Sequence, residues 1–263
     1  MKIITIVNEK GGVGKTATAV NLAYEIFLRN NKVLLIDLDP GGFASSALGI
    51  NYINGEPYHN QKRILETSFD IFRISENKYN KFEINGITLC PAGEKLSWLD
   101  ANLAGVIGKE KLLKKFLSKY TGFDFVIIDC KGSLGILSIN AMVASTHIIA
   151  VTQPEFSSLE GVVKLNNTVE LIKDNYNDKV NISGVVVAMY DERLNIHKES
   201  LIKIKESEQF RAKLYKTIIP RNVSISEAIQ EGEPVSKYKP NSKGAIAYKA
   251  LANELIERIK NDN

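Results

Sequence analysis

Three glycines, two lysines and a threonine cluster near the start of the chain, in a run that ends Gly14-Lys15-Thr16. The glycines let the backbone curl so that successive N–H groups point inward, where they can bind phosphate oxygens. A lysine after such a turn can bridge the terminal phosphates of a nucleotide, and the next hydroxyl can coordinate Mg²⁺. We therefore predict a phosphate-binding loop with the sequence Lys10-Gly11-Gly12-Val13-Gly14-Lys15-Thr16.

Three aspartates follow short apolar runs elsewhere in the chain. Asp37 and Asp129 each end such a run, and Asp39 comes two residues after Asp37. An Asp-rich turn after a strand is common in its own right. In a parallel sheet, however, carboxylates at the carboxyl ends of strands face the crevice in which ligands bind. Beside the phosphate loop, these three residues are candidates for the same site.

The elements that would position these residues alternate along the chain. Continuous β-branched runs predict strands buried on both faces, and apolar residues at helical spacing predict helices between them. We expect strands at residues 3–7, 33–36, 125–128, 147–151 and 182–188, and helices at 15–28, 111–120, 159–173 and 245–260. This rhythm predicts an α/β fold: a single P-loop NTPase domain over residues 1–263, with a mostly parallel twisted sheet of about seven or eight strands and helices on both faces.

Composition narrows the class of protein. The 263 residues include 34 Lys and Arg against 30 Asp and Glu, a net charge of only +4, and 44% are hydrophobic. No apolar run approaches the roughly 20 residues that a transmembrane helix needs. Two cysteines cannot build a disulfide framework, and with three histidines they make a structural zinc site a poor interpretation. We expect a cytoplasmic protein, in which residues 49–79 form an irregular, polar insertion.

The phosphate loop departs from the general pattern, since Glu9 replaces a glycine and Lys10 supplies a second lysine. Together with Ala-Val-Asn-Leu-Ala at residues 19–23, the loop resembles the deviant Walker A motif of the ParA/Soj/MinD ATPases. Later blocks are also similar to this family, and those of the second half resemble the Soj-type partition proteins; the blocks lie at residues 34–40, 124–130, 155–161, 219–228 and 242–252. Only residues 52–89 have no clear counterpart.

The resemblance implies an ATPase that uses ATP and Mg²⁺ and dimerises around the nucleotide. Lys10 would reach the phosphates of the partner subunit, Lys15 would bind those of its own, and Asp39 would position the attacking water. Asp37 and Asp129, with Thr16, would support Mg²⁺. The nucleotide contacts would come from Lys10, Gly11, Gly12, Val13, Gly14, Lys15, Thr16 and Ala17, and, around the adenine, from Met189, Pro220 and Asn222. For Met189, a place in the hydrophobic core is an equal alternative.

Two departures fall on the loops that would sense the γ-phosphate. Residues 41–42 are Gly-Gly where the family usually has Gln-Gly, and residues 131–132 are Lys-Gly where it usually has Pro-Pro. Glycine adds backbone freedom, and proline removes it. We expect nucleotide binding to survive and hydrolysis to be slow; neutral drift of the two loops is the alternative.

Positive charge gathers late in the chain: residues 193–221 contain eight basic and three acidic residues. Such a surface can bind phosphates without reading sequence, although an isolated charge run is usually a solvated helix face. The resemblance implies that Arg193 and Arg221 bind DNA non-specifically, and we add Lys198 and Lys243. The expected partners are non-specific DNA, a ParB-like centromere-binding protein and a second copy of the chain, in a nucleoid-associated segregation ATPase.

Two other functions remain open in the same superfamily. A MinD-like positioning ATPase would need a C-terminal helix that binds membranes. Here the apolar stripe of Ile246, Leu251, Leu255 and Ile259 is paired with a polar face of balanced charge, so we assign the stripe to core packing and expect no membrane partner. A nucleotide-dependent switch with impaired hydrolysis is the second alternative. A metal-handling version ranks last, because Cys90 and Cys130 lack metal-ligand spacing.

Overall fold

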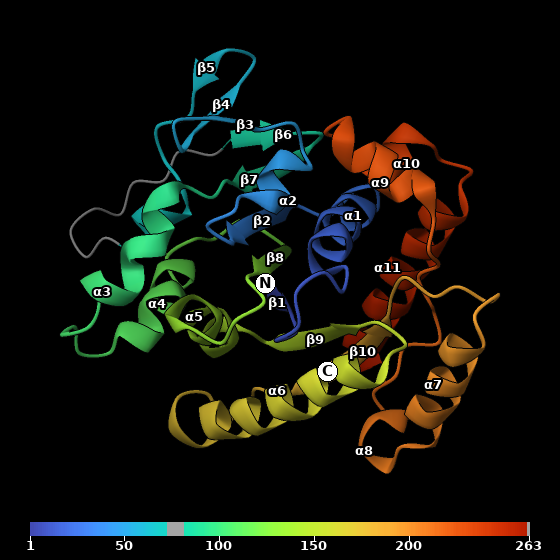
Figure 1. Ribbon diagram of the computed structural model, residues 1–263. Coiled ribbons are helices and arrows are strands. Elements are labelled where there is room, and N and C mark those ends of the chain that lie inside the picture. Colours follow the sequence, from blue (N-terminus) through green and yellow to red (C-terminus); the bar gives the residue numbers. More distant parts are fainter. Residues whose placement is uncertain (73–81, 262–263) are drawn as a thin grey trace.

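The computed structural model describes residues 1–72 and 82–261 and is built around one large sheet (Figure 1). Seven strands lie in the order β10-β9-β1-β8-β2-β7-β6. All neighbouring pairs are parallel except β6 with β7, which is antiparallel at the edge. The strands are β1 (Lys2–Val7), β2 (Val33–Leu38), β6 (Phe82–Ile84), β7 (Ile87–Cys90), β8 (Phe125–Cys130), β9 (His147–Thr152) and β10 (Ile182–Val187). The predicted fold is confirmed.

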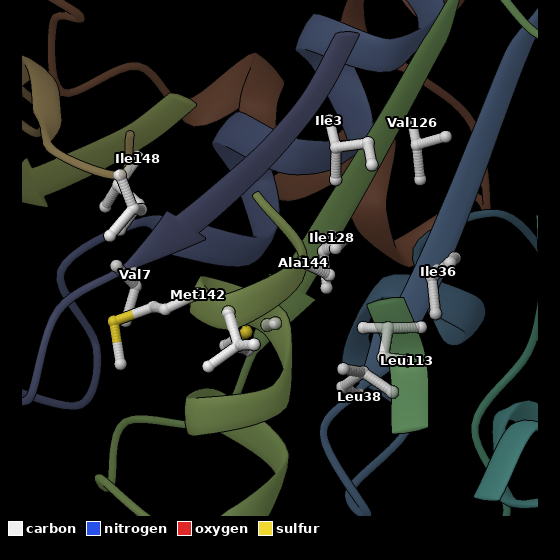
Figure 2. Packing of buried hydrophobic residues seen from close by; sticks show 14 of the residues in the cluster. Ile3, Val7, Ile36, Leu38, Leu113, Val126, Ile128, Met142, Ala144 and Ile148 are labelled. Carbon is white, nitrogen blue, oxygen red and sulfur yellow. The ribbon is translucent and has the colours of Figure 1, made fainter. Parts of the chain in front are cut away.

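The central strands are buried on both faces, which explains their continuous apolar sequences. In β1, Ile4 and Ile6 belong to one hydrophobic cluster, whereas Ile3 and Val7 belong to the other. Figure 2 shows the cluster that contains Ile3 and Val7, to which Leu113 and residues of neighbouring strands and helices also belong. Its helices are α4 (Leu112–Leu117), α5 (Ile136–Ala144) and α6 (Phe156–Asn175), and the opposite face carries α1 (Lys15–Phe27), α9 (Val223–Gln230), α10 (Val235–Tyr238) and α11 (Lys243–Asn261).

The stretch expected to be irregular contains a small antiparallel sheet, so that prediction was wrong for its described part. Its strands are β3 (Asn51–Ile53), β4 (Glu56–His59) and β5 (Lys62–Arg63), followed by the 3₁₀ helix η1 (Ser68–Phe72). Asn54 and Gly55 turn the chain between β3 and β4 with positive φ values of 50° and 76°. Asn-Gly is a strong hairpin signal, so this turn could have been predicted from the sequence. Residues 73–79 of the stretch lie outside the described residues.

The C-terminal helix packs into the hydrophobic core, as expected, mainly against α1, but through a different set of side chains. Leu251, Leu255 and Ile259 are buried, whereas Ile246 is 58% exposed and does not belong to the stripe. Tyr248 is buried on the inner face instead. The stripe prediction was therefore wrong at its first residue. None of the helices in residues 1–72 and 82–261 is both long and apolar enough to cross a bilayer.

The remaining helices are short and lie in the connections. The predicted helix at 111–120 is only one and a half turns of α4, because the 3₁₀ helix η3 (Lys109–Lys111) precedes it and turns follow it. The other elements are α2 (Phe43–Ser46), η2 (Glu94–Trp98), α3 (Leu99–Asn102), α7 (Asn195–Glu206) and α8 (Glu208–Arg211).

Candidate nucleotide site

The predicted phosphate loop joins β1 to α1 at the carboxyl edge of the sheet. Gly12 and Gly14 have φ values of 74° and 95°, which only glycine adopts readily. Gly14 precedes α1, and no side chain caps that helix. The first N–H groups of α1 are therefore available to an anion at the positive end of the helix dipole.

Lys15 is the buried cation of this loop. Its side chain is 7% exposed, and Nζ donates to the Lys10 carbonyl at 2.9 Å. Burial lowers its pKa from the usual lysine value, and the nearby Asp129 carboxylate opposes this shift. Only that one acceptor is recorded for the ammonium among the described residues. A bound phosphate would supply further acceptors for an ammonium that burial has cut off from water.

Asp129 and Asp37 lie side by side on β8 and β2 as register partners, and both are fully buried. Thr16 Oγ1 donates to Asp129 Oδ2 at 2.8 Å, whereas Asp129 Oδ1 has no hydrogen-bond partner. Burial raises the pKa of Asp129 well above its usual value and raises that of Asp37 to about 6. Hydroxyl and carboxylate oxygens are the ligands that Mg²⁺ prefers, so Thr16 and the orphaned Asp129 oxygen fit this ion.

Asp37 does more to order the next loop than its sequence position indicated. Its Oδ1 accepts from the Asp39 N–H at 3.0 Å, and its Oδ2 accepts from the N–H and hydroxyl of Ser45 at 2.8 and 2.7 Å. The Asp39 carboxylate is only partly buried, and its Oδ1 accepts from the Gly41 N–H at 2.9 Å. Asp37 thus fixes the loop that carries Asp39, and its role toward Mg²⁺ stays a prediction.

The two departing loops are placed against the phosphate loop and against β3. Gly42 has φ 64°, and a Cβ there would lie 2.6 Å from the Tyr52 ring, so this glycine is required. A Cβ on Gly132 would lie 3.2 Å from both Gly11 N and Lys15 Nζ. The loop after β8 therefore contacts the phosphate loop directly. Lys131 beside it is exposed.

Asparagine in place of Asp129 is expected to stabilise the nucleotide-free protein. The folded protein binds the Asp129 proton more tightly than the unfolded chain does, because burial raises the pKa. The stability that protonated Asp129 gives the folded protein is therefore fully present below the usual aspartate pKa. It is lost as the pH rises through the raised pKa of the folded protein. Urea unfolding without Mg²⁺ should show a larger gain for Asp129→Asn at pH 7 than at pH 5. An equal gain at both values would contradict this prediction.

Lys10 is held within its own chain. Its Nζ forms an ion pair with Glu155 Oε2 at 2.8 Å, and its N–H donates to Asn8 Oδ1 at 3.1 Å. It is therefore not a loosely solvated loop lysine. Glu155 was not predicted as its partner, and no local pattern could have identified it, since 145 residues separate the two.

A cavity of about 290 Å³ lies beside the phosphate loop. Met189, with φ 56° and a side chain that is 38% exposed, lines it, so the core alternative for Met189 was wrong. Asn222 Oδ1 is buried without a hydrogen-bond partner, as suits an acceptor for an exocyclic amine. The other predicted residues on the wall are Gly14, Ala17 and Pro220, and the unpredicted ones include Gln153, His197 and Tyr248.

Both predicted DNA-binding arginines are connected to the cavity, one as part of its wall and the other through hydrogen bonds. Arg221 lines it, and the Arg221 N–H donates to the Tyr190 carbonyl at 2.8 Å. Arg193 is 84% exposed and grips Asp191 through two side-chain bonds of 2.9 and 2.7 Å, which hold the pKa of that carboxyl well below its usual range. His197 Nδ1 accepts from the Asp191 N–H at 3.0 Å. One hydrogen-bonded unit thus links the cavity wall to Arg193.

Lys198 and Lys243, the other predicted DNA contacts, are exposed at the surface. Lys198 follows His197 on α7, and Lys243 begins α11. Gly244 packs against Asn222, whose Oδ1 would lie 3.2 Å from a Cβ at that glycine. Both lysines are therefore next in sequence to residues that line the cavity or pack on its wall.

Comparison with known proteins agrees with this geometry. A family model described as "AAA domain" matches residues 1–182. The sporulation initiation inhibitor protein Soj of Bacillus subtilis (strain 168) is 39% identical over 255 residues, which cover 97% of this chain and 98% of Soj. The chromosome partitioning protein ParA of Caulobacter vibrioides is 34% identical over 264 residues, which cover 98% and 95%.

A solved structure extends the likeness to the whole fold. Cobyrinic acid a,c-diamide synthase from Mycobacterium smegmatis, with bound ADP and magnesium, aligns with a TM-score of 0.82 at 28% identity, over 100% of this chain and 97% of that one. The matches with Soj and ParA each span nearly the whole chain. The chain therefore belongs to the ParA/Soj family of partition ATPases.

Proposed function

We propose that this protein is a nucleotide-driven DNA-segregation ATPase in which all 263 residues act as one domain. ATP with Mg²⁺ drives the formation of a nucleotide-sandwich dimer, and the dimer binds DNA non-specifically on the nucleoid. A ParB-like protein at a centromere-like site stimulates hydrolysis, which releases the dimer. Three features of one site carry the proposal: the buried ammonium of Lys15, the Asp129 oxygen without a hydrogen-bond partner, and the uncapped N-terminus of α1.

Different groups of the site would bind different parts of the nucleotide. The loop N–H groups and Lys15 would bind the phosphates, and Thr16 and Asp129 would hold Mg²⁺, which would neutralise charge on the phosphates. The adenine occupies the cavity, where Asn222 Oδ1 accepts from its amino group. Asp39, at the tip of an ordered loop, is left to orient the water that attacks the γ-phosphate.

Lys10 has to exchange partners in this mechanism. Its ammonium is paired with Glu155 inside the chain, and both side chains are partly exposed. An exposed ion pair is worth at most about 1 kcal/mol, so multiply charged phosphates from a second subunit can displace the carboxylate. Dimerisation would then move Lys10 from Glu155 to the partner's nucleotide.

Arg221→Ala tests the DNA step. We expect its DNA affinity with ATP to fall and the slope of log K against log salt to decrease in magnitude by about 1, because one phosphate contact is lost. Fluorescence anisotropy of a labelled duplex, titrated with salt in ATP, ADP or no nucleotide, measures both. Arg63→Ala is the matched control, since Arg63 lies on β5 and pairs with Glu56. DNA binding that is no tighter in ATP than in ADP, or binding to anionic vesicles in place of DNA, would overturn the proposal.

Restoring stiffness to the loop after β8 is expected to speed hydrolysis. Lys131→Pro is the suitable change, because a side chain at Gly132 would press on Gly11 and Lys15. Proline reduces the conformational entropy of the loop by the equivalent of about 0.4–1 kcal/mol. If the activation free energy of hydrolysis falls by the same amount, turnover should rise about 2- to 5-fold. Phosphate release measures turnover, and Lys131→Ala separates the loss of charge from the gain of stiffness. Unchanged turnover in Lys131→Pro would favour neutral drift of the loop.

A further inference from the structure

A second hollow lies at the opposite edge of the sheet from the nucleotide site. Its volume is about 1010 Å³, and the first residues of β1, β9 and β10 line it. The phosphate loop follows the other end of β1, which spans six residues or about 20 Å. A ligand here would therefore leave the nucleotide and the cavity beside it untouched.

Five lysines line this hollow, which we call the amino-edge groove. Lys2 lies on β1, and four others come from outside the strands: Lys114, Lys173, Lys179 and Lys213. Glu170 is the one acidic residue on its wall. No ion pair is formed by any of the four lysines within residues 1–72 and 82–261. The groove is thus a concentration of unneutralised positive charge in a chain whose net charge is only +4.

Helix electrostatics explain only part of this arrangement. A lysine near a helix C-terminus is stabilised by the helix dipole, which accounts for Lys114 on α4 and Lys173 on α6. Lys179 and Lys213 lie outside helices, yet the backbone around each is fixed. The Lys213 carbonyl accepts from Val185 N–H at 2.9 Å, and Asn177, two residues before Lys179, donates to the carbonyls of Val143 and Ser145. Four cations are therefore held around one groove.

We propose that the amino-edge groove binds the phosphodiester backbone of duplex DNA, as a second DNA surface on the same chain. Lysine ammonium groups act as point charges for phosphates and read no base sequence. His147 is the one ring on the wall, so the groove lacks the aromatic platforms on which single-stranded bases stack. Its volume also exceeds what a single phosphate group fills. With DNA bound at both edges of the sheet, one molecule would bridge two duplex segments.

The test is DNA binding in ADP, in which the nucleotide-dependent surface of the proposed function is off. Lys173→Gln with Lys179→Gln should reduce the magnitude of the salt slope by about 2, because two phosphate contacts are lost. Lys164→Gln is the matched control, since Lys164 is exposed on α6 nine residues before Lys173 and hence about half a turn away around the helix. Glu170→Gln should have the opposite effect and tighten binding, whereas Glu257→Gln on α11 should not.

Bridging is measured as capture of a free labelled duplex by protein bound to an immobilised one. Measured with ATP, so that both surfaces can bind, the double lysine variant should lose capture, whereas Arg63→Ala on β5 should keep it. An unchanged salt slope in the double variant, an equal loss in Lys164→Gln, or loss of anionic-vesicle binding with DNA binding intact would each overturn the groove proposal. Failure of the proposed function would show differently, as a loss of the ATP-dependent part of binding alone.

Discussion

Lys15→Ala is expected to abolish ATP hydrolysis and to weaken ATP binding by roughly 100-fold, the scale of losing one preorganised charged donor from a buried site. The wild-type ammonium is nearly buried, lies beside the Lys10 carbonyl and contacts the loop at Gly132. It is already ordered, so it binds a phosphate without the entropic cost of immobilising a free lysine. Isothermal titration with ATP and Mg²⁺ measures the affinity, and phosphate release measures turnover.

The loss should not come from unfolding. Burial already disfavours the Lys15 ammonium, as its lowered pKa shows, so alanine removes a desolvated charge, and this gain offsets the lost bond to the Lys10 carbonyl. Thermal unfolding without nucleotide should therefore show no loss of stability in Lys15→Ala, whereas the stabilisation by added ATP should vanish. Lys131→Ala is the matched control, because Lys131 is an exposed lysine near the same loop. ATP affinity retained in Lys15→Ala would rule out the phosphate role.

The sheet was predictable because its strands carry a signal that few other structures produce. Runs such as residues 125–128 and 148–151 are apolar at every position, and a strand covered on both faces buries them all. The phosphate loop was predictable for a related reason, since its glycines, lysine and threonine are contiguous. Local sequence determines both features.

The parts of the site that were missed are made by contacts between distant segments. Glu155 pairs with Lys10 although 145 residues separate the two. The carboxylate of Asp37 accepts a hydrogen bond from Ser45, which lies in a loop whose path the sequence does not predict. For Met189, the sequence left the core as an equal alternative to the cavity, because its apolar side chain follows a buried strand. Its left-handed backbone, however, turns it toward the cavity. The two hairpins at Asn54-Gly55 and Asn85-Gly86 were missed although Asn-Gly is itself a hairpin signal, because the strands they join are too short to show a period.

Asp39→Asn is expected to keep ATP binding and lower turnover by roughly 100-fold or more, the scale of losing a general base or an equivalent charge. Asparagine can still accept the Gly41 N–H through its side-chain oxygen, so the loop that Asp37 holds stays in place. What it loses is the negative charge that would orient and activate the attacking water. Without hydrolysis, ATP stays bound to the variant. Its DNA binding in ATP should therefore persist long after the wild type has dissociated from DNA.

A second variant separates this chemical role from a purely structural one. Asp39→Ala loses both the charge and the bond to the Gly41 N–H, whereas Asp39→Asn loses the charge alone. If the carboxylate acts on water, the two variants should hydrolyse ATP equally slowly. If it only orders the loop, asparagine should retain most of the turnover and alanine little. Single-turnover hydrolysis and DNA dissociation, measured side by side for the two variants, therefore decide whether Asp39 takes part in the reaction or only shapes the loop around it.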